Sequence, residues 1–310
     1  MGYRLKKREC VADGLRRISA DQLTRAARSL ENVREPRDLD DAIHDARVRL
    51  KRVRSILHLI GPALGHDARR EDHALRATAH LLAGQRDTVS LLEALAALRE
   101  RFGAVDPAAF NAAATILAEP SRSHGSKAQP SPTPGALDLA RSPASVAADQ
   151  LALAAERAGA WAIDADGFDC LRAGLRASYG AVRDGRKHAL NSDDAAVRHA
   201  WRTGVRRLSD QLRLIRGVWP DLIQPQAEAL RHVAAGLGKD HDFWLLGTRL
   251  REPAIATENP ASLAAIARLA DRSAREMVDA VRAPAKRALA EKSGAFIGRI
   301  QSLWTTWRGD

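Results

Sequence analysis

The chain contains 310 residues, 45% of them hydrophobic, which is enough to bury the core of one large domain or two smaller ones without a metal ion or disulfide for stability. Its 49 Lys and Arg residues exceed its 38 Asp and Glu residues, and the net charge of +11 predicts an anionic partner. The 2 cysteines lack the spacing of zinc ligands and no apolar run is long enough to cross a membrane, so we expect a cytoplasmic protein without a metal, a cofactor or a membrane span.

Alanine, leucine and arginine dominate the sequence, whereas runs of β-branched or aromatic residues bounded by turns are nearly absent. This composition predicts an all-α fold. In chain order, apolar periodicity and helix-ending residues predict helices at 10–32, 39–60, 66–102, 107–118, 137–161, 167–190, 193–216, 222–251 and 259–310. We expect Gly61-Pro62 to end the second helix and Pro284 to break or kink the last one.

The second half of the sequence repeats the first with an offset of 155 residues. The corresponding pairs include His44 and His199, Arg47 and Arg202, Lys51 and Arg206, Arg76 and Arg231, and Asp87 and Asp242. A neighbouring offset of 160 residues aligns Arg16 with Arg176. Between the copies, the segment 119–135 is rich in proline and serine. We therefore predict two copies of one helical unit, 1–118 and 136–310, joined by a flexible link over 119–135.

Basic side chains line one face of the helix predicted at 39–60, within an arc of about 80° beside its apolar face. This first stripe consists of His44, Arg47, Lys51, Arg54 and His58, and Arg52 is expected to point away from it. The second stripe consists of His199, Arg202, Arg206, Ser209 and Arg213. Neither stripe contains an acid, whereas a charged face that is merely solvated would intersperse acids with the basic residues. The stripes therefore predict a surface that binds many phosphate oxygens along a chain.

Two other functions stay open at this point. The net charge would also suit nucleic acid, although single-strand binders interleave aromatic and basic residues and aromatics are only 4% of this chain. The pair His241-Asp242 would suit a metal-dependent hydrolase of polyphosphate or triphosphate, which needs several converging ligands. The first copy has Arg86 at the position of His241, and an arginine does not bind a metal ion.

The two copies also carry the motifs of a known family. These are HDARVRLKRVR (44–54) and LRATAHLLAGQRDTVSLL (75–92), repeated as HAWRTGVRRLSDQLRLI (199–215) and LRHVAAGLGKDHDFWLL (230–246). With them, the sequence resembles the CHAD family, the conserved histidine α-helical domain, over the whole chain apart from the link. The resemblance implies one CHAD domain with two pseudo-symmetric four-helix units around a basic cavity or groove. It also implies binding of inorganic polyphosphate without catalysis and association with polyphosphate granules.

The resemblance points to nine polyphosphate-binding residues, which are His44, Arg47, Lys51, Arg54, Arg76, His199, Arg202, Arg206 and Arg231. On chemical grounds, Arg16 and Arg176 would extend the groove, and Asp87 and Asp242 would orient an Arg or His within it. The second copy has Thr203 where the family commonly has Lys, and Ser209 where a larger residue is usual, which implies a weaker site in that half. The sequence leaves the oligomeric state open.

Overall fold

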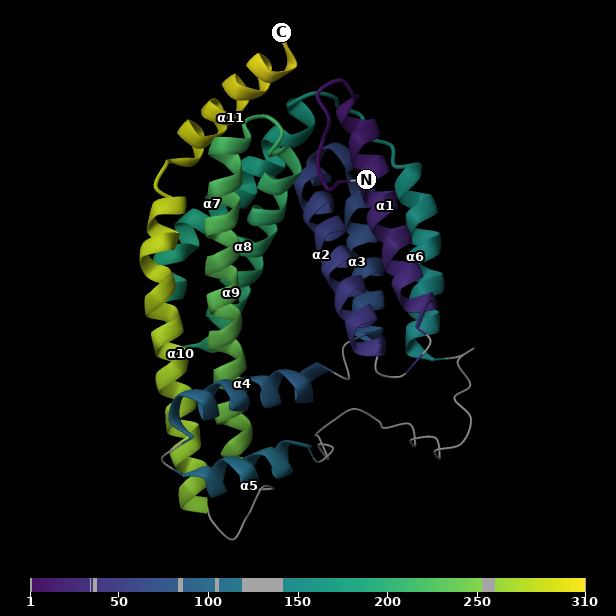
Figure 1. Ribbon diagram of the computed structural model, residues 1–310. Coiled ribbons are helices and arrows are strands. Elements are labelled where there is room, and N and C mark those ends of the chain that lie inside the picture. The colour runs from purple at the N-terminus through teal and green to yellow at the C-terminus, as the bar shows by residue number, and fades with distance from the viewer. Residues whose placement is uncertain are drawn as a thin grey trace.

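The chain is described by a computed structural model that covers residues 2–33, 35, 38–82, 86–103, 106–118, 142–252 and 260–309 (Figure 1). Within these ranges the regular structure is helical and no strand occurs, as the composition predicts. The helices are α1 (Val11–Glu31), α2 (Leu39–Leu64), α3 (His66–Leu81), α4 (Arg86–Phe102), α5 (Pro107–Ala118), α6 (Pro143–Gly159), α7 (Asp169–Asn191), α8 (Ala195–Ile215), α9 (Pro220–Leu250), α10 (Pro260–Ala288) and α11 (Ser293–Arg308). None of these helices is long and apolar enough to span a bilayer.

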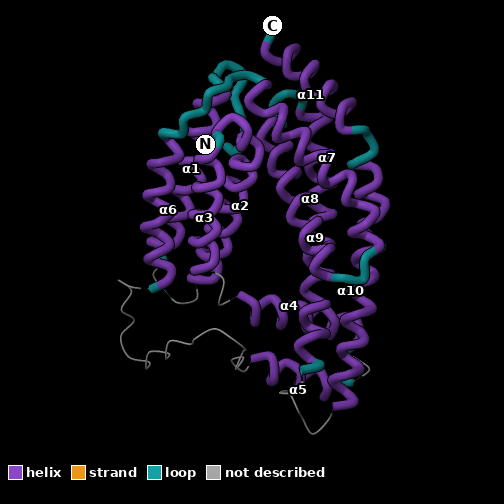
Figure 2. The backbone as a smooth tube through the Cα atoms, turned by 180° about the vertical axis from the view of Figure 1, so that it is seen from behind, coloured by secondary structure: helices purple, strands orange, loops and turns teal. Residues whose placement is uncertain are grey.

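Two helical bundles lie side by side (Figures 1 and 2). The first bundle consists of α1, α2, α3 and α6, and the second consists of α7, α8, α9 and α10, with α11 packed against α7. Helix α2 joins the bundles, because it contacts both α7 and α8. The contact between α2 and α7 depends on Gly174, where an added Cβ would lie 1.8 Å from the carbonyl oxygen of Leu59. A side chain at this position would force the two bundles apart.

A further group of helices lies at one end of the second bundle and has its own hydrophobic core. Here α4 and α5 pack on the end of α9 and the beginning of α10, and the core includes Leu98, Phe110, Leu246 and Ile266. Helix α6, in contrast, packs against α1 and α3. Each half of the sequence therefore contributes helices that pack on the other half: α4 and α5 pack on α9 and α10, and α6 packs on α1 and α3. The predicted link over 119–135 lies outside the described residues.

Three predicted helix boundaries are wrong. Helix α2 continues through Pro62 to Leu64, because burial of Leu64 offsets the hydrogen bond that proline cannot donate. Gly65, with φ of +61°, then ends the helix in a conformation that favours glycine. The helix predicted at 66–102 is two helices, α3 and α4, which bury their apolar faces in different cores. The last predicted helix is also two, α10 and α11, and Pro284 lies inside α10.

Candidate anion-binding site

Helices α2 and α8 meet at two buried residues, Ser55 and Asp210. The Ser55 Oγ atom lies 3.4 Å from Asp210 Oδ2, and the Gln211 side-chain amide donates to the Ser55 carbonyl oxygen at 3.1 Å. Ser55 and Asp210 are 155 residues apart, the offset that aligns the two halves of the sequence. The helices thus meet at corresponding positions, with the first stripe on one of them and the second stripe on the other.

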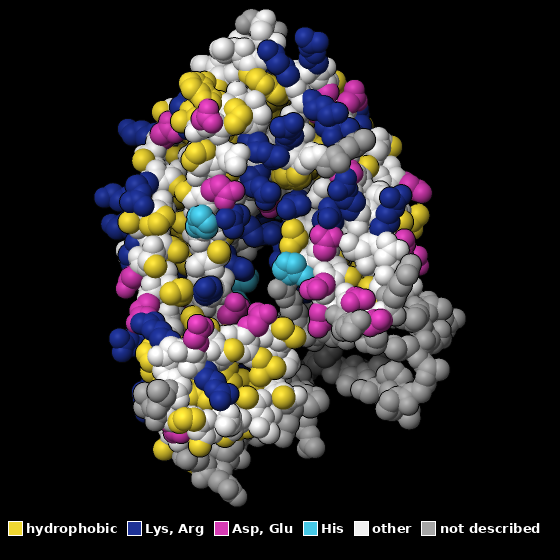
Figure 3. All heavy atoms as spheres, viewed as in Figure 1, with side chains coloured by type: hydrophobic (Ala, Val, Ile, Leu, Met, Phe, Trp, Pro, Cys, Tyr) yellow, Lys and Arg dark blue, Asp and Glu magenta, His cyan; other side chains and the backbone are white. Residues whose placement is uncertain are grey.

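The surface is hollowed between the two bundles, and Lys, Arg and His side chains gather around the hollow (Figure 3). Electrostatic effects show which charges of the two stripes lie near one another. Burial lowers the pKa of the His199 ring, and the charge of Lys51 on the opposite helix acts in the same direction. Burial likewise lowers the pKa of the Arg206 guanidinium, and Arg54 on α2 contributes to this effect. Because such effects fall off with distance, the two stripes lie close to each other.

Arg54 carries a counter-ion that the sequence analysis missed. Its guanidinium binds the Asp72 carboxylate of α3 with two hydrogen bonds of 2.8 and 3.2 Å. Burial acts to raise the pKa of Asp72, but these hydrogen bonds and the charge of Arg54 hold it below its ordinary value. At the corresponding positions in the second half, the Ser209 hydroxyl donates to the Ala227 carbonyl at 2.8 Å. The first half therefore has an ion pair where the second has a neutral hydrogen bond.

Arg47 and Arg202 are anchored in similar ways in the two halves. Arg47 donates to the Leu82 carbonyl oxygen at 2.9 Å, and Arg202 donates to the Ala234 carbonyl oxygen at 3.0 Å. Gly238 makes room for the second guanidinium, because a Cβ there would lie 2.9 Å from Arg202 Nη2. Each arginine is thus anchored by a backbone carbonyl.

His199 lies against a second histidine. Its ring centroid is 4.4 Å from that of His241, which in turn stacks on Trp244 at 5.8 Å. Burial lowers the pKa of His199, the charge of His241 lowers it further, and the Asp242 carboxylate opposes them. Burial lowers the pKa of the Arg202 guanidinium, and the charge of Asp242 opposes this effect. Asp242 therefore lies near both His199 and Arg202. The side chain of Asp87 lies outside the described residues.

A model of the CHAD domain family matches residues 17–251 of the 310. The chain belongs to the CHAD family. Among solved structures, PptA from Streptomyces chartreusis is similar over 90% of this chain and 99% of its own, with a TM-score of 0.53 and 19% identity. That likeness concerns the fold. No curated protein matches the sequence. The resemblance expected at the two ends of the chain lies outside the matched residues.

Three further predicted site residues of this CHAD protein lie at its surface. His44 is exposed on α2, and Arg76 is exposed on α3. Burial lowers the pKa of His58 in the first stripe, and the charge of Arg76 acts in the same direction. Arg231 is exposed on α9 and pairs with Glu228 at 2.8 Å.

The two residues expected to extend the groove lie on other helices. Arg16 donates to the Trp161 carbonyl oxygen at 2.8 Å and pairs with Asp13 on its own helix. Arg176 is exposed on α7. Electrostatic proximity therefore groups Lys51, Arg54, His199, Arg202 and Arg206, and Arg16 has its partners on α1 and at Trp161.

Sequence reasoning missed a second group of charges where α2 meets α8 in this CHAD domain. Burial raises the pKa of the Asp210 carboxyl, and the guanidiniums of Arg206, Arg52 and Arg213 oppose this rise. Arg52 was expected to point away, yet it lies near Asp210 and over the Tyr3 ring, 5.6 Å from its centroid. Its counterpart at the 155-residue offset, Arg207, was not singled out either. That correspondence was the signal in the sequence that could have identified both arginines.

The described residues of the CHAD domain contain no group of three His, Cys, Asp or Glu side chains that could hold a metal ion. His241, which the sequence offered as a metal ligand, stacks on Trp244 and lies at a tilt against His199.

Proposed function

We propose that this CHAD protein binds inorganic polyphosphate between the stripes of α2 and α8 and does not catalyse its hydrolysis. The observation that carries the proposal is the electrostatic proximity of Lys51 to His199 and of Arg54 to Arg206, across two helices. A bound polyanion would accept charge-assisted hydrogen bonds from these groups, beside the Asp72 carboxylate that pairs with Arg54 and the Asp210 carboxylate that acts on Arg206.

The chemistry of the stripes favours a chain of phosphates over a single carboxylate. Arginine offers a planar fork of donors, lysine a compact charge, and histidine a donor that gains charge in mild acid. Placed along two facing helices, these groups can contact successive phosphate units from both sides. Membership of the CHAD family supports polyphosphate as the ligand, and we extend the proposal to association with polyphosphate granules in the cell.

We further propose that the two bundles are copies related by a pseudo-twofold axis that passes near Ser55 and Asp210. Under twofold symmetry, a residue close to the axis lies against its own counterpart. The 3.4 Å approach of Ser55 to Asp210 supports this relationship, since their positions correspond at the offset of 155 residues. The basic groove would then be built from two equivalent walls, and the exchange of Arg54 for Ser209 makes the second wall weaker.

The test is a titration with long-chain polyphosphate and with double-helical DNA at matched phosphate concentration and salt. We expect polyphosphate to bind more tightly, with an affinity that falls as salt rises because counterions are released on binding. Equal affinity for DNA would contradict the proposal. Release of phosphate from polyphosphate in the presence of Mg²⁺ would show that the protein is a hydrolase instead.

A further inference from the structure

Two histidines lie against each other where α8 packs on α9, and one of them belongs to the second stripe. The rings of His199 and His241 have centroids 4.4 Å apart and are tilted by 48°. The residues directly before them, Arg198 and Asp240, form a buried ion pair with two hydrogen bonds of 2.7 and 3.0 Å. This ion pair ties α8 to α9 beside the rings, so the packing of the fold holds the two histidines together.

The surroundings of His199 disfavour a proton on its ring in the ligand-free protein. Burial lowers the pKa of His199, and the charge of His241 on α9 lowers it further. Arg202 on α8 and Lys51 on α2 act in the same direction, and the Asp242 carboxylate on α9 opposes them. The Nδ1 atom of His199 is buried and has no hydrogen-bond partner among the described residues, so a proton there would be a buried donor. His199 therefore stays neutral to a lower pH than an ordinary histidine does.

Helix α7 also packs on α8, but on the side away from His199. There the Trp201 indole N–H donates to the Val182 carbonyl oxygen of α7 at 2.8 Å. Trp201 follows His199 by two residues, which is about 200° around a helix. The charges nearest His199 therefore come from α2, α8 and α9, the helices that border the groove.

A phosphate chain between α2 and α8 would reverse this balance. Its negative charge beside Lys51 and His199 favours the protonated form of the ring. Two protons on rings 4.4 Å apart would repel each other, so the pair has room for about one. We propose that the pair of His199 and His241 is the proton-linked part of the groove, and that binding of polyphosphate brings about one proton onto this pair. The proposal rests on the proposed function and adds His241 to the residues that determine it.

The first half of the sequence does not repeat the pair. Arg86 occupies the position that corresponds to His241 at the offset of 155 residues, and an arginine stays protonated throughout the physiological range. The proton linkage should therefore belong to the second half alone. The substitution His241→Arg gives the second half the residue of the first, with a permanent charge in place of one that titrates.

The direction of the pH dependence follows from these charges. Without a ligand, the pKa of His199 lies below the ordinary value of about 6.5, because of burial and the neighbouring cations. A bound polyanion raises this pKa, so the complex holds a proton that the free protein lacks at pH values between the two pKa values. The affinity for polyphosphate should therefore rise as the pH falls, by at most about tenfold per pH unit for one proton.

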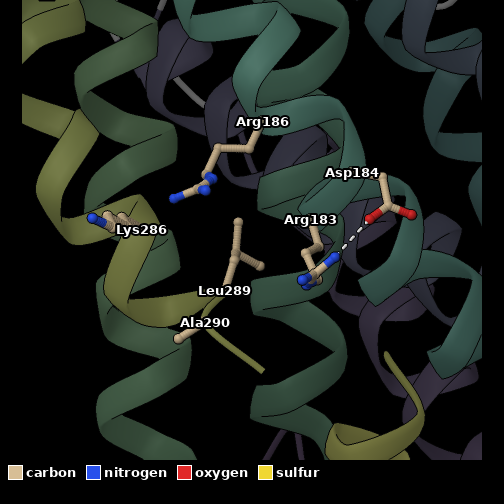
Figure 4. Close-up of a pocket in the computed structure, with 6 residues that line it drawn as sticks. All are labelled: Arg183, Asp184, Arg186, Lys286, Leu289 and Ala290. Carbon is tan, nitrogen blue, oxygen red and sulfur yellow. Dashed lines mark hydrogen bonds and ion pairs between the residues drawn. The ribbon is translucent and has the colours of Figure 1, made fainter. Parts of the chain in front are cut away.

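A pocket between α7 and α10 provides a control, because these helices carry neither stripe. Its lining residues are Arg183, Asp184, Arg186, Lys286, Leu289 and Ala290 (Figure 4). None of these six lining residues is a histidine. The variant Arg186→Gln with Lys286→Gln therefore lowers the net charge of the protein without a change in the groove, and it should keep the proton uptake.

The test is calorimetric titration of the full chain with long-chain polyphosphate in two buffers that differ in their enthalpy of ionisation, which gives the number of protons taken up. We expect about one proton per protein near pH 6.5, and an affinity about tenfold higher at pH 5.5 than at pH 7.5. His241→Arg should bind at least as tightly as the unmodified protein at pH 7.5 and take up at most about half as many protons. His199→Asn should also reduce the uptake, whereas His73→Asn, at an exposed position on α3, should keep it.

The possible failures of this test are distinct. Tight binding with an affinity that does not change with pH, and without proton uptake, would overturn the inference and leave polyphosphate binding standing. Full uptake in both His241→Arg and His199→Asn would assign the protons to other histidines, such as His58 of the first stripe, and would overturn it as well. No binding of polyphosphate at any of these pH values would overturn the proposed function and this inference with it.

Discussion

Ser55 on α2 and Asp210 on α8 lie 3.4 Å apart, oxygen to oxygen, at positions that correspond in the two halves of the sequence. Both side chains are buried, and the Asp210 carboxyl lies near the guanidiniums of Arg52, Arg206 and Arg213. This acid therefore balances positive charge from both helices, Arg52 on α2 and Arg206 and Arg213 on α8.

Replacing Asp210 with alanine should therefore destabilise the fold. The change leaves three partly buried arginines without the buried carboxylate between them, and breaking a buried pair typically costs about 3 kcal/mol. Urea denaturation measures the loss in the free energy of unfolding. Asp13→Ala, which removes an exposed partner of Arg16, is the control and should cost less than about 1 kcal/mol. Equal losses in the two variants would show that Asp210 has no special role.

Gly174→Ala should weaken the packing of α7 on α2. The added Cβ would lie 1.8 Å from the Leu59 carbonyl oxygen, so one helix must move, and overpacking of this kind costs about 1–3 kcal/mol. Gly159→Ala, at the end of α6, meets no atom within 4 Å and serves as the matched control. Thermal denaturation should show a lower Tm for Gly174→Ala alone. An unchanged Tm would mean that the bundles are not in such close contact.

The stability of the ligand-free protein should fall as the pH decreases from about 7 toward 5, through the ordinary pKa of histidine. Burial and the charge of His241 lower the pKa of His199, so the unfolded chain takes up a proton at a higher pH than the folded one. The stability contributed by neutral His199 is complete above the ordinary pKa and is lost as the pH falls. His199→Asn should reduce this slope in denaturation curves, whereas His73→Asn, at an exposed position on α3, should keep it. Identical slopes for both variants would contradict the prediction.

Removal of the Asp72 charge should strengthen the binding of polyphosphate. Asp72→Asn frees the Arg54 guanidinium from its two hydrogen bonds to the carboxylate and removes a negative charge beside the groove. The gain should be about threefold at low salt, since the ion pair is partly exposed. Asp149→Asn makes the same change in net charge at an exposed position on α6 and should have a smaller effect in the same titration. A weaker affinity in Asp72→Asn would show that Arg54 needs its acid to bind phosphate.

The sequence predicted helices within a few residues where one amphipathic face serves one core, as at α1, α5, α7 and α8. It failed at 66–102, because apolar periodicity is the same whether a segment is one helix or two that pack in different places. The stripes on α2 and α8 could be predicted, since helical spacing places their side chains on one face.

The counter-ions of the stripes could not be predicted in the same way. Asp72 comes from another helix, and the proximity of Arg52 to Asp210 depends on how α2 meets α8. A pattern within one helix contains no information on such contacts between helices.

The most direct test of polyphosphate binding in the groove is the affinity of the variant Lys51→Ala with Arg206→Ala, measured beside Arg268→Ala with Arg275→Ala. Both variants lose two positive charges, but only the first loses them from the facing helices. We expect the groove variant to bind polyphosphate at least about tenfold more weakly, with a shallower dependence on salt, and the control to bind like the unmodified protein. Equal affinities for the two variants, both still folded by circular dichroism, would contradict the proposal that polyphosphate binds between α2 and α8.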